Sequence, residues 1–208
     1  MQQGSPEWHA IRAGRVTASR VADVVAKTKT GYSSSRANYL AELIVERLTG
    51  DPAPTFQTEA MRRGSELEPD ARVAYEFRTD AIVVEIAFVE HPTIDMTGAS
   101  PDGLIGDDGL LEIKCPNTAQ HVETLLSGDI PGKYLTQMQW QMACTGRRYC
   151  DFVSFDPRLP EAMSLFIKRV NRDDKRIAEL ETEVRAFIAE LDAKESELRR
   201  RFDRRDAA

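Results

Sequence analysis

The sequence has 208 residues, of which 41% are hydrophobic and 30% are charged, a composition typical of one globular domain. No apolar run reaches the roughly 18 to 20 residues that cross a bilayer, and the N-terminus does not resemble a signal peptide, so we expect a cytosolic protein. The net charge of −6 argues against a general nucleic-acid binder but suits an enzyme that holds divalent cations among acidic residues. Three cysteines without metal-type pairing argue against a disulfide framework and against a zinc or iron–sulfur site.

The first part of the chain favours helices. Apolar spacing predicts a short helix over 17–27, followed by a polar loop and a second helix over 36–49 that ends at Gly50. Helical spacing returns over 58–78, where Pro69 must either kink the helix or occupy the first turn of a new one.

The second part favours strands and then helices. Strand-like runs occupy 81–91, 104–105 and 110–115, and a Gly- and Asp-rich turn joins the last two, which predicts a β-meander. The remaining elements are a helix, two strands and a long helix with an apolar stripe, over 132–145, 149–155, 163–170 and 172–203. This order predicts an α/β or α+β fold with a mixed central sheet flanked by helices. We expect one domain over 1–170, with 171–208 as a C-terminal helix packed on it or extending from it.

The strand after the turn carries an acid and an amine two residues apart. Side chains on a strand alternate between faces, so Leu111, Ile113 and Cys115 form an apolar face that we assign to the core. Glu112 and Lys114 share the other face, which we expect to be reachable from solvent.

A further acid, Asp102, precedes the turn at nearly the same height. A two-residue loop at Asp107-Asp108 would set Asp102 opposite Ile113, on the wrong face. An odd loop or a bulge would set it opposite Glu112, and the three glycines around the turn favour such an irregularity.

These groups suggest a chemistry. Two carboxylates and the backbone carbonyl between Glu112 and Lys114 are hard oxygen ligands, suited to Mg²⁺ or Mn²⁺. Such ions polarise a phosphodiester and activate water, and Lys114 would orient that water or stabilise developing negative charge. The pattern therefore favours metal-dependent phosphodiester hydrolysis. The same residues are also compatible with a solvated Glu–Lys pair beside an everyday Pro-Asp-Gly turn.

Pro101-Asp102 followed by Glu112-Ile113-Lys114 resembles the signature of the lambda exonuclease and YqaJ-like viral recombinase group, within the PD-(D/E)XK nuclease superfamily. Three other segments, in the family's order, are similar to its N-terminal segment, its Gly-X-X-X-Glu helix and its Gln-containing helix: 7–19, 64–69 and 134–142. The resemblance implies a restriction-endonuclease-like core.

The resemblance also implies site residues. Asp102, Glu112 and the Ile113 carbonyl would be metal ligands for two Mg²⁺ ions, which Mn²⁺ could replace. Lys114 would be the catalytic lysine. Glu68 would be a ligand or lie beside the ligands, and the alternative is an exposed helix glutamate.

Other residues are implied to contact the substrate. Gln137 would touch the reacting region, although Gln137 and Gln141 stand one helical turn apart and could simply form a polar helix face. Arg12, Ser19 and Ser100 are similar to the residues that hold the terminal 5′-phosphate, and an arginine with a hydroxyl near a helix N-terminus suits an anion. The alternative is that Ser19 caps a helix and Arg12 is a surface charge.

The function implied is a Mg²⁺-dependent 5′-to-3′ exonuclease that degrades linear double-stranded DNA to mononucleotides and leaves a 3′ single strand for recombination. Relatives form a ring of three subunits around DNA and work with a single-strand annealing protein, so we expect a homotrimer with such a partner. Two alternatives stay open. One is an endonuclease or junction resolvase that uses the same acids and lysine, and the other is a non-catalytic DNA-end-binding recombination scaffold.

Overall fold

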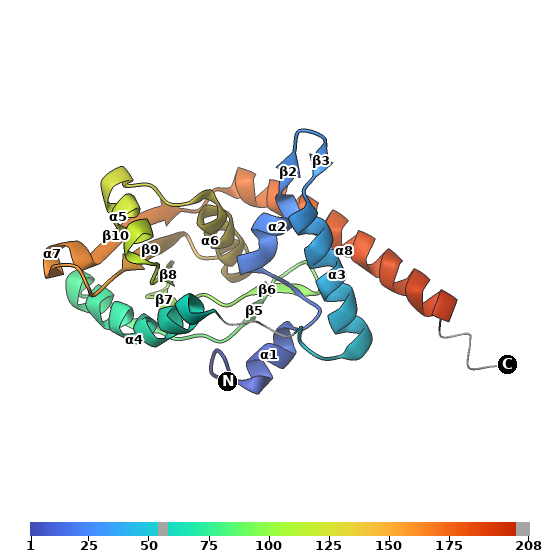
Figure 1. Cartoon of the computed structure of the whole chain (residues 1–208), viewed down its shortest axis with the longest axis horizontal. Coiled ribbons are helices and arrows are strands. Elements are labelled where there is room, and N and C mark those ends of the chain that lie inside the picture. Colours follow the sequence, from blue (N-terminus) through green and yellow to red (C-terminus); the bar gives the residue numbers. More distant parts are fainter. Residues whose placement is uncertain (54–57, 203–208) are drawn as a thin grey trace.

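The protein is described by a computed structural model that covers residues 1–53 and 58–202 (Figure 1). Its centre is a five-stranded mixed sheet with the order β10-β9-β8-β7-β4, in which β8 and β9 are parallel and the other neighbours antiparallel. The strands of this sheet are β4 (Val83–Val84), β7 (Gly103–Ile105), β8 (Gly109–Lys114), β9 (Tyr149–Phe155) and β10 (Leu165–Asn171). The predicted α/β architecture with a mixed sheet is confirmed.

Helices cover both faces of this sheet. The parallel pair β8–β9 requires a crossover, which α5 (Thr118–Ser127) and α6 (Gly132–Thr145) supply. α6 has its predicted bounds, whereas α5 was not predicted. On one face α4 (Glu59–Thr79) packs Ala71 and Tyr75 against Leu111 and Ile113, and on the other α6 packs Met138 and Met142 against Leu110 and Phe152. β8 is therefore buried on both sides.

A second, three-stranded sheet has the order β1-β6-β5 and consists of β1 (Val16–Thr17), β5 (Val89–Glu90) and β6 (Thr97–Ala99). The single strand expected over 81–91 is wrong, because the chain crosses from the large sheet at β4 to the small sheet at β5 within that run. β4, β7 and β8 are antiparallel neighbours as in a meander, but the chain visits β5 and β6 between β4 and β7. β6 was not predicted, since it is short and contains Gly98.

The N-terminal region departs from the prediction in its details. α1 (Pro6–Arg12) was not predicted, and the helix expected over 17–27 is only α2 (Val21–Val25), preceded by a 3-10 turn over Ala18–Arg20. This helix is short because its expected ends pair as strands, in β1 and in the hairpin β2 (Lys27–Thr28) and β3 (Gly31–Tyr32), which replaces part of the polar loop.

The bounds of the next two helices are close to those predicted from the sequence. α3 (Ser34–Thr49) ends at Gly50, whose φ of 77° is the left-handed conformation expected there. α4 is one helix with Pro69 inside it, so the alternative of a new helix at Pro69 is wrong.

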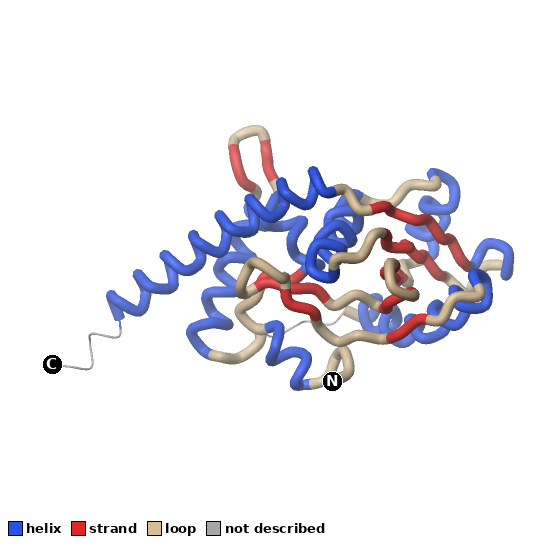
Figure 2. The backbone as a smooth tube through the Cα atoms, turned by 180° about the vertical axis from the view of Figure 1, so that it is seen from behind, coloured by secondary structure: helices blue, strands red, loops and turns tan. Residues whose placement is uncertain are grey.

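The last helix, α8 (Asp174–Phe202), runs along the outside of the molecule and extends past it (Figure 2). Just before β10, the first residues of the expected strand 163–170 form the short helix α7 (Glu161–Ser164) instead. Apolar residues of α8 join the core formed by α2, α3 and β1, namely Leu180, Val184, Phe187 and Leu191. None of the helices within the described ranges is long and apolar enough to cross a membrane.

Candidate active site

The turn between β7 and β8 sets the position of Asp102. Ile105 pairs with Gly109, which leaves a three-residue turn, and this register places Asp102 opposite Glu112. The Asp102 N–H donates to the carbonyl of Leu111 at 3.1 Å, which extends the ladder to this residue. Directly opposite residues of an antiparallel pair point to the same face. Of the two registers that the sequence left open, the structure has the odd loop, and the two acids share a face.

The Asp102 side chain is anchored on the neighbouring strand. Its Oδ2 accepts a hydrogen bond from the backbone N–H of Ile113 at 2.6 Å. Burial, and then the negative charge of Glu112, raise the pKa of Asp102 well above its ordinary value, against the opposing effect of Lys114. The site thus holds an excess of negative charge that a cation would relieve.

Glu112 lies under α6. Its side chain has no exposed surface, so the expectation that this face is open to solvent is wrong for Glu112. The amide of Gln137 donates to Oε1 at 2.6 Å and the amide of Gln141 donates to Oε2 at 2.6 Å. Gln137 and Gln141 do form one polar face of the helix, as the alternative reading of the sequence proposed. This face is directed at the carboxylate, so both glutamines contact the site.

Lys114 lies at the edge of this buried cluster. Its Nζ is 2.5 Å from Oε1 of Glu112, and 28% of its side chain is exposed. Burial lowers the pKa of Lys114, but the carboxylates of Glu112 and Asp102 raise it by more, so the net shift is upward. Lys114 is therefore an ammonium that faces two acids, and the alternative of a solvated surface pair is wrong.

Glu68 approaches the same region from α4. This helix passes close to the end of β8 at Gly64, one turn before Glu68, where an added Cβ would lie only 3.8 Å from the carbonyl oxygen of Cys115. Burial raises the pKa of Glu68, and this effect outweighs the attraction of Arg72 and Lys114. Arg72 Nη2 donates to Glu68 Oε1 at 3.3 Å, and the same guanidinium pairs with Glu85. Glu68 is thus a partly buried acid within electrostatic range of Lys114.

The donor set fits a hard divalent cation by its chemistry. Three carboxylates and the Ile113 carbonyl offer oxygen ligands, and two of these carboxylates, Asp102 and Glu68, have raised pKa values. Across the described ranges, no group of three or more His, Cys, Asp or Glu side chains is already arranged as a metal cage. In this structure Glu112 is directed at Lys114 and two amides instead.

Two of the three candidate phosphate residues, Arg12 and Ser100, form a second cluster with Trp8. The Ser100 Oγ accepts hydrogen bonds from Arg12 Nη1 and from Trp8 Nε1, both at 3.0 Å. The Arg12 guanidinium lies 4.0 Å from the centre of the Trp8 ring, and burial lowers the pKa of Arg12 to about 10. No carboxylate of the described residues lies within ion-pair distance of Arg12, so its positive charge is available to an anion.

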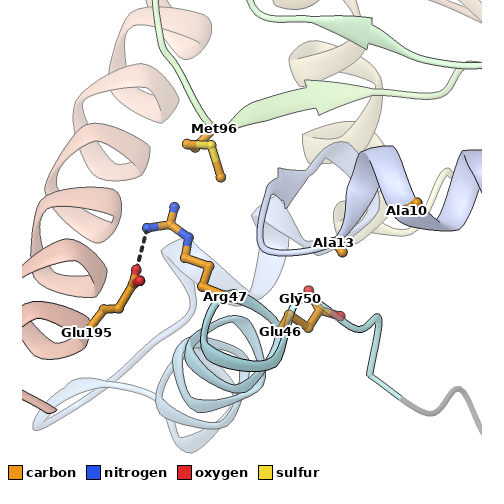
Figure 3. Close-up of a pocket in the computed structure, with 7 residues that line it drawn as sticks. All are labelled: Ala10, Ala13, Glu46, Arg47, Gly50, Met96 and Glu195. Atoms are coloured by element: carbon orange, nitrogen blue, oxygen red, sulfur yellow. Dashed lines mark ion pairs between the residues drawn. The ribbon is translucent and has the colours of Figure 1, made fainter. Parts of the chain in front are cut away.

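Ser19 does not cap a helix, because it lies inside the 3-10 turn, whose N-cap is Thr17. It is exposed and lines a cleft of about 710 Å³ together with Arg12, Glu68 and Arg72. Trp8 and Arg12 therefore line the same cleft as Glu68, the acid on α4. A smaller pocket of about 410 Å³ adjoins this cleft, with which it shares Ala13 and Glu46. It lies between α1, α3 and α8, and none of the predicted site residues lines it (Figure 3).

Two residues of this region were missed from the sequence as functional residues. Gln141 contacts Glu112 as directly as Gln137 does. Arg72 lies one helical turn after Glu68 and pairs with it. In both cases the i,i+4 spacing from a predicted site residue is the signal that could have indicated the contact.

Comparisons with known proteins identify the fold. Residues 7–148 match the YqaJ-like viral recombinase domain. The alkaline exonuclease LHK-Exo from Laribacter hongkongensis is 55% identical, with a TM-score of 0.90 over 96% of this chain and 99% of that chain, and it is equally similar in its complex with dAMP. A phage related exonuclease from Haemophilus somnus 129PT, at 16% identity, shares the fold with a TM-score of 0.71 over 88% of this chain and 96% of that chain. A comparison with curated proteins finds no significant match. The chain therefore belongs to the YqaJ-like viral recombinase domain family, within which it is an enzyme of the alkaline exonuclease type.

Proposed function

We propose that the protein is a Mg²⁺-dependent exonuclease that degrades linear double-stranded DNA in the 5′-to-3′ direction from 5′-phosphorylated ends. It releases mononucleotides and leaves a 3′ single strand for recombination by annealing. The observation that carries this proposal is the buried Glu112, paired with Lys114 and opposite Asp102, on the fold of an alkaline exonuclease. The complex of LHK-Exo with dAMP, a mononucleotide, supports the proposed product.

In this proposal Asp102, Glu112, Glu68 and the Ile113 carbonyl hold two Mg²⁺ ions, for which Mn²⁺ can substitute. When bound, such ions polarise the phosphodiester and make a water molecule more acidic. The Lys114 ammonium orients the attacking water or stabilises negative charge that develops on the phosphate. Gln137 contacts the reacting region and keeps Oε1 of Glu112 in place.

The Ser100 cluster would bind the terminal 5′-phosphate. A hydroxyl oxygen has two lone pairs, and on Ser100 both accept N–H groups, from Arg12 and from Trp8, whose indole N–H is shared with the carbonyl of Ala87 at 2.9 Å. The hydroxyl hydrogen is therefore left to donate to an incoming oxygen. Arg12 adds a positive charge, and Ser19 adds a second hydroxyl in the cleft that Arg12 lines.

We also propose that three copies form a ring around DNA, that a single-strand annealing protein is the partner, and that the protein acts in the cytoplasm of a bacterial host. A ring holds DNA by topology, so it needs few tight phosphate contacts and tolerates a net charge of −6. Light scattering of the purified protein tests this assembly, and a stable monomer at working concentration would contradict it.

The experiment that tests the reaction compares three DNA substrates in Mg²⁺: linear duplex with 5′-phosphate, linear duplex with 5′-hydroxyl, and closed circles. Lys114→Ala serves as the inactive control. We expect rapid loss of the phosphorylated linear DNA alone. Cutting of closed circles would indicate an endonuclease. No cleavage of any substrate, together with no binding of Mg²⁺ in calorimetry, would indicate a scaffold.

A further inference from the structure

We propose that Gln141 is a positioning residue that fixes the orientation of the Glu112 carboxylate for the reaction. Gln141 lies on α6, has no exposed surface, and donates from Nε2 to Oε2 of Glu112 at 2.6 Å. The inference rests on the proposed function, in which Glu112 is a metal ligand. Of the two glutamines that contact Glu112, the family resemblance implies a role for Gln137 alone.

The Glu112 carboxylate has few acceptor positions left for a metal ion. A carboxylate offers roughly four lone-pair positions, two on each oxygen. Oε1 accepts from Gln137 and contacts Lys114, so both of its positions are used. Oε2 accepts from Gln141, which leaves one position open. The open position on Oε2 is where Glu112 can contact a divalent ion without loss of its present partners.

Gln141 determines where that position points. The terminal torsion of a glutamate side chain is broad, because rotation about an sp³–sp² bond has no sharp minima. Contacts on Oε1 alone would leave Oε2 free to swing. A second amide on Oε2 fixes the plane of the carboxylate from both ends, and α6 holds both amides rigidly because they are one helical turn apart.

The Gln141 amide is itself held in one direction. Its Oε1 accepts a weak hydrogen bond from the Cys150 thiol, at 3.9 Å from Sγ, and Cys150 lies on β9 beside the strand that carries Glu112. With the oxygen turned to the thiol, the amide nitrogen faces the carboxylate. Gln141 thus connects β9, α6 and β8 at the site.

The same helix provides a matched control in Gln139. Gln139 is also buried, but its Nε2 donates to the carbonyl of Asn171 at 2.8 Å and its Oε1 accepts from the N–H of Asp173 at 2.9 Å. These contacts hold the chain between β10 and α8 and do not reach the acids. Loss of Gln139 should therefore affect stability, and loss of Gln141 should affect the site.

The test compares Gln141→Met with Gln139→Met, because methionine has a similar length and no N–H donor. We expect Gln141→Met to lower kcat on linear DNA by about 10- to 100-fold and to weaken Mn²⁺ binding in calorimetry by about tenfold, as loss of a partner of a metal ligand commonly does. The KM for DNA should stay near the wild-type value. Gln139→Met should lower the melting temperature but keep kcat and Mn²⁺ affinity.

The outcomes separate this inference from the proposed function. If the wild-type protein digests DNA and binds Mn²⁺ while Gln141→Met matches it in both, the inference is overturned and the proposed function stands. If the wild-type protein does neither, the proposed function fails. Gln141→Ala, which leaves room for a water molecule in place of the amide, replaces Gln141→Met if that variant does not fold, with the same expected losses.

Discussion

The Lys114 ammonium and the Glu112 carboxylate are in contact, with Nζ 2.5 Å from Oε1, and the Glu112 side chain has no exposed surface. An ion pair with one wholly buried partner is held in a medium where charges interact more strongly than in water. Removal of Lys114 would leave the carboxylate with two amides and no counter-ion.

Lys114→Met should therefore reduce the rate of DNA digestion by about 10²- to 10³-fold, the usual effect of losing a group that stabilises developing charge. Lys133→Met is the matched control, because Lys133 and Lys114 approach the same Tyr134 ring, with Nζ at 4.8 and 5.3 Å from its centre. Digestion of phosphorylated linear DNA measures both. If the Lys114→Met enzyme digested DNA as fast as the Lys133→Met enzyme, Lys114 would have no part in the mechanism.

The raised pKa of Asp102 makes stability depend on pH when no metal is bound. A folded-state pKa above the unfolded value means that the folded protein holds this proton more tightly. The associated stability is present below the unfolded pKa of about 4 and is lost as the pH rises through the folded pKa. In EDTA at about pH 8, Asp102→Asn should therefore melt at a higher temperature than the wild type, and the difference should shrink toward pH 4.

Thermal unfolding at several pH values checks this, with Asp107→Asn as the control, since Asp107 is exposed in the turn. Mg²⁺ should stabilise the wild type more than it stabilises Asp102→Asn. Equal melting temperatures for Asp102→Asn and Asp107→Asn across the pH range would show that the charge of Asp102 does not lower the stability of the folded protein.

Arg12→Ala should weaken the preference for phosphorylated ends. The loss of a charged hydrogen bond of about 1.5–3 kcal/mol corresponds to a rise in KM of about 10- to 100-fold for 5′-phosphate DNA, with little change for 5′-hydroxyl DNA. Arg15→Ala is the control, because Arg15 lines the same cleft but is paired with Glu90 at 2.8 Å. If Arg12→Ala slowed both substrates equally, the phosphate pocket would have to lie elsewhere.

Phe187→Ala should destabilise the protein by about 3–5 kcal/mol, since Phe187 is wholly buried and stacks on Tyr39 with ring centres 5.7 Å apart. Phe77→Ala, a change at a side chain that is 88% exposed, should shift the free energy of unfolding by no more than about 0.5 kcal/mol. Urea unfolding measures both variants. A small effect at Phe187 would mean that α8 contributes little to the core.

Local patterns predicted the parts of the site that depend on local geometry. The alternation along β8 and the possible loop lengths gave the two positions that Asp102 could take, and the three-residue turn selects the one opposite Glu112. α8 was predicted because its apolar stripe is long enough to show helical periodicity.

Features that depend on distant segments could not be predicted in this way. Glu112 is buried because α6 places two glutamines on it, which lie 25 and 29 residues further along the chain. The alternation of side chains along a strand cannot indicate such a contact. The run 81–91 has one hydrophobic pattern but is divided between two sheets, since the partners of β4 and β5 lie on different strands. Sequence patterns describe a segment, whereas these outcomes depend on its neighbours in space.

The packing of α8 on the N-terminal core has a consequence for synthesis of the protein in the cell. Val16, Tyr39 and Leu43 share their cluster with Val184 and other residues of α8. A nascent chain emerges from the ribosome N-terminus first, so the N-terminal segment that lines the cleft cannot complete its apolar packing until α8 has been synthesised. Tyr39, which lines the cleft and bonds to the backbone of Arg15 and Thr17, meets Phe187 only at that stage. We therefore expect the nuclease to become competent only after α8 has been synthesised, and a product that terminates before α8 to lack an ordered cleft.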